Sequence, residues 1–297
     1  ENKKMIKYQL KKFKHDNKGP PYKKVCFGIR GQYGDIIMQE PALRKFIKDN
    51  PNTQIVLAVS EPYKQILPLY ESYHENIVEF KVFEGYGHWP SRSDLQYIKD
   101  QNFDAMFPPD IPLHAQNDWA NYRHIVSETA LMIGCDCDTN DIQLNMPEKV
   151  NKEPNTVAVH LFSSKWPYGV RSIAVEKQQT IVKYLLEKGY KVYQLSAPHQ
   201  PQIEGTVIKQ GTYYDACIRM LSTDFLVSCD SGMPWVSSAY EHPTVGLFSS
   251  NYNNLVTTTK NWWPVNLNAS YLEAASANDI NNDLIFKAID KMIERTK

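Results

Sequence analysis

The hydrophobic positions along the chain change their spacing in a regular way. Short runs of adjacent apolar residues, typical of buried strands, alternate with longer stretches in which apolar residues recur every three or four positions, as in helices. In the first half this pattern predicts strands over residues 24–29, 54–60, 77–83 and 103–107, and helices over residues 35–49, 62–70 and 91–100. Such alternation indicates a parallel sheet that is covered by helices on both faces.

A second series of the same kind follows a polar stretch, residues 138–154, which contains two prolines and resembles a linker. The pattern predicts strands over residues 156–162, 191–196, 206–209, 224–229 and 244–248, and helices over residues 175–188, 213–221, 234–241 and 280–296. We therefore expect an α/β protein with two Rossmann-like domains, residues 24–150 and 151–297, that face each other across a cleft. Ligands of such sheets bind outside the carboxyl ends of the strands.

The composition fits this expectation. Hydrophobic residues make up 42% of the chain and charged residues 22%, as in ordinary globular proteins. The apolar runs have strand lengths, far below the ~18 residues of a membrane span, and the first residues do not resemble a signal peptide. The five cysteines are an odd number, and Cys135 and Cys137 have no second pair at zinc spacing. We expect a cytoplasmic protein without disulfides or a metal site.

The net charge of zero hides an asymmetry between the start of the chain and the rest. Residues 1–24 contain nine lysines and only two acidic residues, which is an excess of seven positive charges. A basic arm over residues 1–23 suits contact with a polyanionic acceptor or with the inner face of a membrane. A solvated, frayed terminus is the other interpretation.

The turn after the first predicted strand contains Gly28, Gly31 and Gly34. This spacing differs from the G-x-G-x-x-G of dinucleotide-binding folds, and no acidic residue ends the next strand, which argues against a nicotinamide enzyme. Asp35 follows directly, at the start of a predicted helix. Its carboxylate has two interpretations: it stabilises the first turn of the helix, or it acts as a base at the mouth of the cleft.

A similar turn occurs in the second half, where Asp230, Ser231 and Gly232 follow a buried strand and open a helix. The free N–H groups of a helix start suit a phosphate. Because Asp230 itself would repel phosphate, we interpret it as organising the loop or as binding a sugar hydroxyl. The alternative is an ordinary strand–turn–helix that is capped by Asp230 or Ser231.

A third group of polar residues follows the first strand of the second half. Ser163, Ser164 and Lys165 come directly after this strand, and Arg171 lies a few residues further on. Two hydroxyls and two cations suit a pyrophosphate. A plain surface loop is the alternative, but these residues belong to the same predicted sheet edge as Asp230.

Two segments of the first predicted domain, which we expect to lie between the halves, are rich in aromatic, His and Arg residues. They span residues 84–92, with His88 and Trp89, and residues 110–124, with Arg123. Aromatic faces and guanidinium groups suit a sugar or an anionic acceptor, although a single His is more often a structural or surface residue than a catalytic one. The H-E-x-x-H, Walker A and nucleophile-elbow motifs do not occur in the sequence.

The first turn resembles that of one family, the heptosyltransferase-like glycosyltransferases of family 9. Their first loop commonly reads R-x-x-x-x-G-D-x-x-x-x-x-P-x-L, and Gly34, Asp35, Pro41 and Leu43 match it. Arg30 lies one residue closer to the glycine than the arginine of the family pattern.

The second turn resembles the signature D-S-G-x-x-H-x-x-x-A-x-x-x-P-T-V of the same family. The matching positions are Asp230, Ser231, Gly232, Ala239, Pro243, Thr244 and Val245. Trp235 stands in place of the usual histidine. The family stretch H-P-G-S-S-x-x-K-R-W-P is partly matched by residues 160–166, and the resemblance as a whole spans residues 24–248.

This resemblance implies a GT-B fold, meaning two facing Rossmann-like domains with parallel sheets and an interdomain cleft. It implies transfer of a hexose or heptose from a nucleotide-sugar donor to an acceptor hydroxyl, with Asp35 as general base. The implied donor site consists of Ser163, Ser164, Lys165, Arg171, Asp230, Ser231 and Gly232. The implied acceptor side consists of Gly34, Arg30, His88, Trp89 and Arg123.

The resemblance also implies that the nucleotide sugar is the only co-substrate and that no metal or other cofactor is obligatory. The acceptor is a saccharide, a lipid-linked saccharide or another hydroxyl compound. Two other functions fit the same fold: a sugar-nucleotide epimerase or hydrolase, and a non-catalytic module that binds a nucleotide or sugar. The carboxylate of Asp35 argues against the module, and turnover of a nucleotide sugar without an acceptor would identify the epimerase.

Overall fold

The computed structural model describes residues 18–28, 31–84, 91–107, 124, 126–127, 140–163, 167, 169–252, 255–256 and 263–297. The first half forms a parallel four-stranded sheet in the order β3-β2-β1-β4. Its strands are β1 (Lys24–Gly28), β2 (Gln54–Ser60), β3 (Ile77–Phe83) and β4 (Ala105–Phe107). All four strands predicted for this half are confirmed.

The helices of this half cover both faces of the sheet. They are α2 (Tyr33–Ile37), α3 (Glu40–Asp49), the 3-10 helix η1 (Glu61–Tyr70) and α4 (Arg92–Gln101). Val25 and Phe27 of β1 pack in one core with α2, α3 and η1, whereas Cys26 packs with Ile98 of α4. Successive side chains of a strand point to opposite faces, so this division follows from the alternation along β1.

The single helix predicted over residues 35–49 was wrong, because the structure divides it into α2 and α3. Met38 caps the end of α2, and α3 begins at Glu40 with Pro41 in its first turn. Proline has no N–H to donate to the carbonyl of Ile37, and it is tolerated only in the first turn of a helix. Pro68, by contrast, lies inside η1, which is a 3-10 helix and not an α-helix.

The second half forms a parallel five-stranded sheet in the order β11-β8-β7-β5-β6. Its strands are β5 (Thr156–His160), β6 (Lys191–Gln194), β7 (Phe225–Cys229), β8 (Thr244–Ser249) and β11 (Ala269–Ala274). The sequence did not predict β11, because its side chains are largely half-buried and form no apolar run. The strand predicted over residues 206–209 is only an isolated bridge between Val207 and Tyr193.

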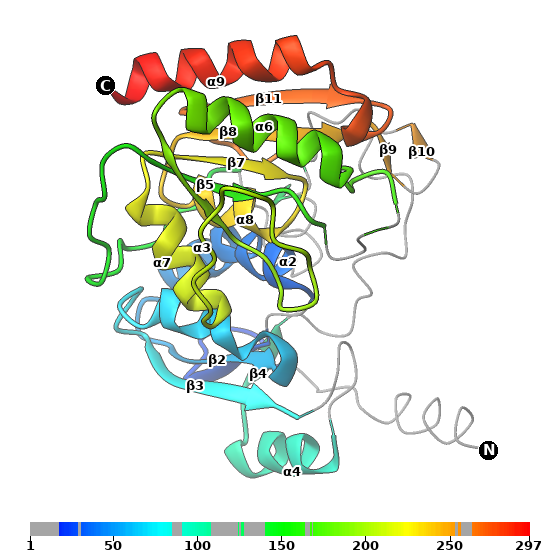
Figure 1. Ribbon diagram of the computed structural model, residues 1–297. Helices are drawn as coiled ribbons and strands as arrows, with labels where there is room; N and C mark the ends of the chain where they lie inside the picture. The colour runs from blue at the N-terminus through cyan, green and yellow to red at the C-terminus, as the bar shows by residue number, and fades with distance from the viewer. Residues whose placement is uncertain are drawn as a thin grey trace, which may run out of the picture.

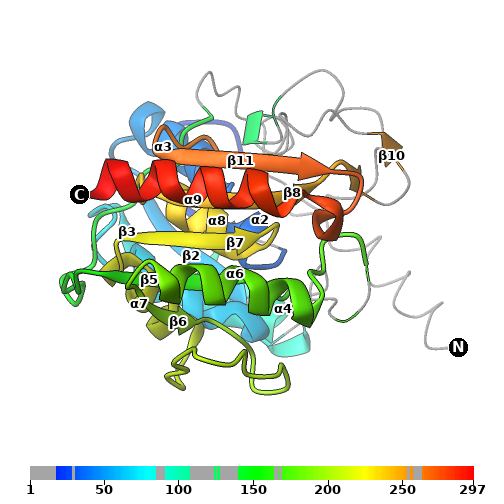
Figure 2. The same cartoon turned by 45° about the horizontal axis from the view of Figure 1, so that its top comes forward.

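Two layers of helices cover the second sheet. Helices α6 (Val175–Glu187) and α9 (Asn282–Thr296) lie on one face, as Figure 2 shows from above. Helices α7 (Tyr213–Ser222) and α8 (Gly232–Ser238) lie on the other face, between the two sheets (Figure 1). A short 3-10 helix, η4 (Ala277–Asp279), precedes α9, and β9 (Asn251–Tyr252) pairs with β10 (Leu255–Val256) in a small hairpin.

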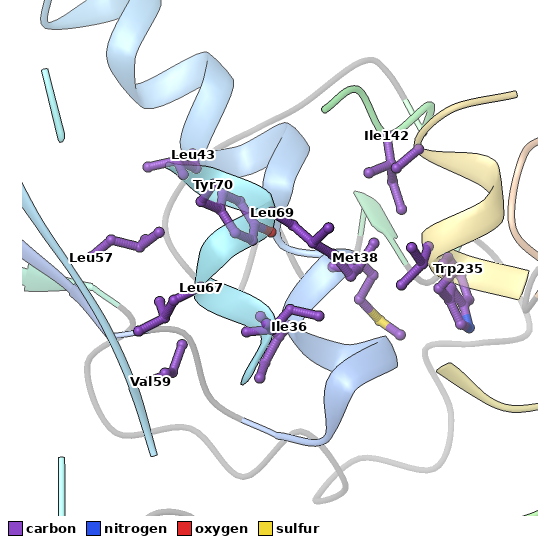
Figure 3. Packing of buried hydrophobic residues seen from close by; sticks show 14 of the residues in the cluster. Ile36, Met38, Leu43, Leu57, Val59, Leu67, Leu69, Tyr70, Ile142 and Trp235 are labelled. Carbon is purple, nitrogen blue, oxygen red and sulfur yellow. The ribbon is translucent and has the colours of Figure 1, made fainter. Parts of the chain in front are cut away.

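One apolar core joins the two halves. Residues of α2 and α3 belong to the same buried cluster as residues of α7 and α8, and Ile142 of the predicted linker lies in it too. In Figure 3, Met38 lies between Ile36 on α2 and Trp235 on α8. Each predicted domain thus contains one sheet, while the predicted boundary at residue 150 stays a prediction.

The segment that connects the halves is tied to both of them. The N–H of Gln143 donates to Glu40 Oε2 on α3 (3.0 Å), and the N–H of Leu144 donates to the carbonyl of Ala239 at the end of α8 (3.2 Å). The connecting segment is thus hydrogen-bonded to both halves.

Only the end of the basic arm lies within the described residues. Lys18 Nζ donates to Asp104 Oδ1 (3.0 Å), and the N–H of Lys23 donates to Asp104 Oδ2 (2.7 Å). The chain is therefore attached to the first half from Lys18 onward, and the expected function of the arm stays a prediction. Among the described residues, no helix is long and apolar enough to cross a membrane.

Candidate functional site

Each sheet contains one point at which the strand order reverses. Strand β1 lies between β2 and β4, and β5 lies between β6 and β7. In each sheet, some later strands are therefore added on one side of this strand and others on its opposite side. Open α/β sheets bind ligands at the carboxyl ends of the strands at such points. The turns that follow β1, β5 and β7 are therefore where the fold favours a site, and they carry the residues predicted from the sequence.

The turn after β1 holds Asp35 in a fixed position. Gly31 has φ +105°, and a Cβ atom there would lie 2.4 Å from Asp35 Cβ, so only glycine fits. Asp35 is the third residue of α2, and its Oδ2 accepts the backbone N–H of Gln32 (2.9 Å). The helix-stabilising interpretation of Asp35 is thus confirmed, and its function as a base stays a prediction.

The turn after β7 is built differently. Ser231 caps α8, where its Oγ accepts the N–H of Met233 (3.3 Å). Asp230 lies outside the helix and opposite a cation, with 3.8 Å between Arg171 Nη1 and Asp230 Oδ2. Burial raises the pKa of the Asp230 carboxyl, the Arg171 charge opposes this rise, and the negative charge of Asp35 adds to it. The last effect shows that the two carboxylates, one from each half, interact.

The two turns meet at a pair of glycines. A Cβ atom on Gly34 would lie 3.1 Å from Trp235 Cδ1 and 3.5 Å from Gly232 Cα, and one on Gly232 would lie 3.3 Å from the backbone nitrogen of Gly34. Helices α2 and α8 therefore approach as closely as they do because both positions lack a side chain. The missing side chain of Gly34 thus lets the other half of the chain approach.

Trp235, which replaces the histidine of the family signature, belongs to this contact. Its side chain is only 5% exposed and covers Gly34. At this position the chain therefore has an apolar side chain that packs between the halves, where the family has a titratable histidine.

Two tyrosines that the sequence analysis did not single out complete the contact between the halves. The rings of Tyr33 on α2 and Tyr213 on α7 are stacked, with 3.5 Å between their centroids and an interplanar angle of 3°. The N–H of Tyr213 donates to Gln65 Oε1 on η1 (2.6 Å). Each tyrosine opens its helix next to a turn rich in polar residues, but no local pattern shows that the two face each other.

The remaining predicted site residues fall into two groups. Ser163 is buried, and its Oγ is hydrogen-bonded to Ser172 Oγ (3.0 Å), so that it fixes the start of the loop after β5. The others lie outside the described residues: Arg30, His88, Trp89, Arg123, Ser164 and Lys165. In the part of the chain that the structure describes, no three His, Cys, Asp or Glu side chains gather in a way that could hold a metal ion.

The chain is similar to known proteins in its three-dimensional structure but not detectably in its sequence. No protein-family model and no curated protein matches the chain by sequence. Among solved structures, a family 9 glycosyl transferase from Veillonella parvula DSM 2008 is similar, with a TM-score of 0.69 and 16% identity over 92% of this chain and 98% of that one.

Two heptosyltransferases of E. coli are similar as well. The ADP-heptose LPS heptosyltransferase II has a TM-score of 0.68 and 14% identity over 92% of this chain and 99% of its own. WaaC, solved with ADP, has a TM-score of 0.63 and 14% identity over 92% of this chain and 100% of its own. The resemblance and the fold class predicted from the sequence are confirmed: the chain has the GT-B fold of the family 9 glycosyltransferases.

Proposed function

We propose that the protein is a glycosyltransferase that transfers a sugar from a nucleotide-diphosphate sugar to a hydroxyl group of an acceptor. The observation that carries this proposal is the meeting of two strand-to-helix turns, one from each sheet. Gly34 packs on Gly232 there, and Asp35 and Asp230 interact electrostatically. The similar proteins named above are glycosyltransferases, and the structural match covers nearly their whole length. One of them was solved with ADP, which supports the same chemistry here.

The donor binds at the carboxyl ends of β5 and β7 in this proposal. Arg171 supplies a guanidinium that can donate two hydrogen bonds to a diphosphate. In the structure Arg171 Nη1 lies 3.8 Å from Asp230 Oδ2, at the carboxyl ends of the strands where the diphosphate is proposed to bind. The full proposed donor site is Ser163, Ser164, Lys165, Arg171, Asp230, Ser231 and Gly232.

Asp35 acts as the general base. The acceptor oxygen attacks the anomeric carbon of the sugar, the bond between that carbon and the diphosphate oxygen breaks, and the acceptor proton passes to Asp35. The leaving nucleoside diphosphate keeps the electron pair, and the positive charge of Arg171 stabilises it. The bond from Gln32 N–H to Asp35 Oδ2 holds the carboxylate in one orientation before the reaction.

The acceptor lies against the first half in this proposal, beside Gly34, Arg30, His88, Trp89 and Arg123. It is a saccharide, a lipid-linked saccharide or another hydroxyl compound. If it is polyanionic, the basic arm of residues 1–23 adds an attraction that weakens steeply with salt.

The proposal is tested by binding and turnover on one preparation. Calorimetry with ADP and other nucleoside diphosphates should show binding to the wild type, and Arg171→Ala should weaken it by roughly 1.5–3 kcal/mol. Arg171→Lys is the matched control, because it keeps the charge and loses only the forked geometry.

Turnover is measured as release of the nucleoside diphosphate from a nucleotide sugar, with and without candidate acceptors. Release that depends on an acceptor supports the proposal. Conversion of the nucleotide sugar without any acceptor would identify an epimerase or hydrolase instead. Absence of nucleotide binding in a folded wild type would contradict the donor site itself.

A further inference from the structure

We propose that the imidazole of His160 is a hydrogen-bond acceptor for an O–H or N–H group of the nucleoside in the bound donor. This inference rests on the proposed function and names a further binding residue of the same site. The sequence analysis gave His160 no function of its own. Three observations carry the inference: the position of the residue, the bond at one ring nitrogen and the lack of a partner at the other.

His160 is the last residue of β5, at the point where the strand order of the second sheet reverses. Residues two apart on a strand point to the same face. Ala158 belongs to the core that the two halves share, whereas Val157 and Val159 belong to the core on the α6–α9 side. The side chain of His160 therefore lies on the face that looks toward the first half, at the carboxyl edge where ligands bind.

The orientation of the ring fixes which nitrogen carries the proton. His160 Nδ1 lies 2.7 Å from the carbonyl oxygen of Leu195, just after β6. A carbonyl oxygen can only accept, so Nδ1 must carry the hydrogen. In the neutral ring, Nε2 then has a lone pair and acts as an acceptor. Burial lowers the pKa of His160, which keeps the ring neutral near pH 7.

The second nitrogen has no partner among the described residues, and the side chain is half-buried. The only hydrogen bond of the His160 ring within these residues is the one at Nδ1. His242 shows the contrasting situation, because its Nε2 is buried without a partner in a side chain that is 3% exposed. His160 is half-buried, unlike the almost fully buried His242.

A pair of substitutions separates the two ring nitrogens. In His160→Asn, the amide Nδ2 can take over the bond to the Leu195 carbonyl, but nothing replaces Nε2. In His160→Gln, the longer side chain brings an amide oxygen to the position of Nε2 and thus keeps an acceptor. His242→Asn is the control, since it changes a neutral histidine of the same half that is enclosed and away from the sheet edge.

The test is calorimetry with the nucleoside diphosphate that binds the wild type most tightly. We expect roughly a tenfold loss of affinity in His160→Asn, a smaller loss in His160→Gln, and wild-type affinity in His242→Asn. The melting temperature of His160→Asn should stay close to that of the wild type. In ¹⁵N NMR of the wild type, the Nε2 resonance should belong to an unprotonated nitrogen and should shift when the nucleotide binds.

Two comparisons complete the test. If the penalty disappears with the 2′-deoxy nucleotide, the group bound is the ribose 2′-hydroxyl; if it persists, another O–H or N–H of the nucleoside is bound, and both results support the inference. Equal affinity of wild type and His160→Asn, together with an unmoved Nε2 resonance, overturns it while leaving the proposed function intact. A wild type that binds no nucleotide overturns both.

Discussion

The turn after β1 and the turn after β7 carry nearly the same residues but use them differently. Both combine a glycine with an aspartate, and both end at the same place, where Gly34 packs on Gly232. Asp35 lies inside its helix and accepts a backbone N–H of its own turn. Asp230 lies before its helix, which Ser231 caps, and its charge is opposed by Arg171.

The carboxylate of Asp35 is thus held by its own backbone, whereas that of Asp230 is paired with a cation. A carboxylate that is oriented by its own backbone offers a defined position for a proton acceptor, whatever is bound nearby. A carboxylate that is paired with a cation at 3.8 Å changes its surroundings when that cation takes another anion. We therefore propose that Asp35 performs the chemical step and that Asp230 and Arg171 recognise the donor. The predictions below probe this division.

The largest effect is expected at Asp35. Asp35→Asn keeps the size of the side chain and an oxygen acceptor for Gln32 N–H but removes the basicity. The expected loss of turnover is ~10²–10⁴-fold, the usual contribution of a positioned base, with nucleotide affinity and melting temperature little changed. Steady-state kinetics, calorimetry and thermal melting of one preparation measure all three.

Asp94 provides the control for Asp35. It also occupies the third position of a helix, α4, where its Oδ2 accepts the N–H of Ser91 (2.7 Å). Its Oδ1 also accepts the N–H of Glu84 (3.0 Å), and Asn has only one oxygen for these two donors, so Asp94→Asn should lower the melting temperature without lowering turnover per folded molecule. Near-wild-type turnover in Asp35→Asn would mean that Asp35, like Asp94, only stabilises its helix.

Glu40 is a third carboxyl at the contact of the halves, and it sharpens the comparison because all its contacts are structural. It is fully buried, where it receives hydrogen bonds from the hydroxyl of Tyr73 and from Gln143 N–H, and its Oε1 lies 3.0 Å from Arg44 Nε. Burial raises the pKa of Glu40 from 4.5 to about 7, although Tyr73, Arg44 and Gln143 oppose the rise.

The sign of the pH effect follows from this raised pKa. The folded protein binds the proton of Glu40 more tightly than the unfolded chain does, so this contribution to the free energy of unfolding is fully present below pH 4.5 and is lost as the pH rises to about 7. The loss is on the order of 3 kcal/mol. Glu40→Gln should remove this part of the pH dependence in urea unfolding between pH 4.5 and 8. An unchanged slope in the variant would contradict it.

The glycine contact gives the next effect. Gly232→Ala places a Cβ atom 2.9 Å from Tyr213 Oη and 3.1 Å from Tyr33 Cβ. Overpacking of this kind costs about 1–3 kcal/mol, measured as the free energy of unfolding in urea. Gly19→Ala is the control, because nothing lies within 4 Å of its Cβ position. If both variants are equally stable, the close approach of α2 and α8 is not a constraint on the fold.

The smallest effect is expected for the stacked tyrosines. A double-mutant cycle with Tyr33→Leu and Tyr213→Leu should give a coupling energy of about 0.5–1.5 kcal/mol in unfolding experiments. Tyr184 and Phe286, stacked at 4.0 Å within the second half, provide the matched cycle. Similar couplings in both cycles would show that the halves unfold as one unit. A coupling near zero for Tyr33 and Tyr213 alone would show that the halves separate first.

Most of the fold could be predicted because its signals are local. Runs such as residues 54–60 and 77–83 have the closely spaced apolar residues of strands, and their predicted bounds agree with β2 and β3. The prediction failed where a local pattern was weak or interrupted. Pro41 ended a continuous helical periodicity, and β11 had no apolar run because it lies half-buried beside β8.

The sequence by itself determined the two parallel sheets and placed Gly34, Asp35 and Asp230–Gly232 in turns at the carboxyl ends of strands, since the strand and helix periods and the turn residues are properties of neighbouring positions. Only the tertiary structure decided which turn meets which. The contact of Gly34 with Gly232 and the stacking of Tyr33 on Tyr213 join residues about 180 or more positions apart. Such contacts depend on how two separate helical layers fit together, and no spacing along one chain segment records that fit.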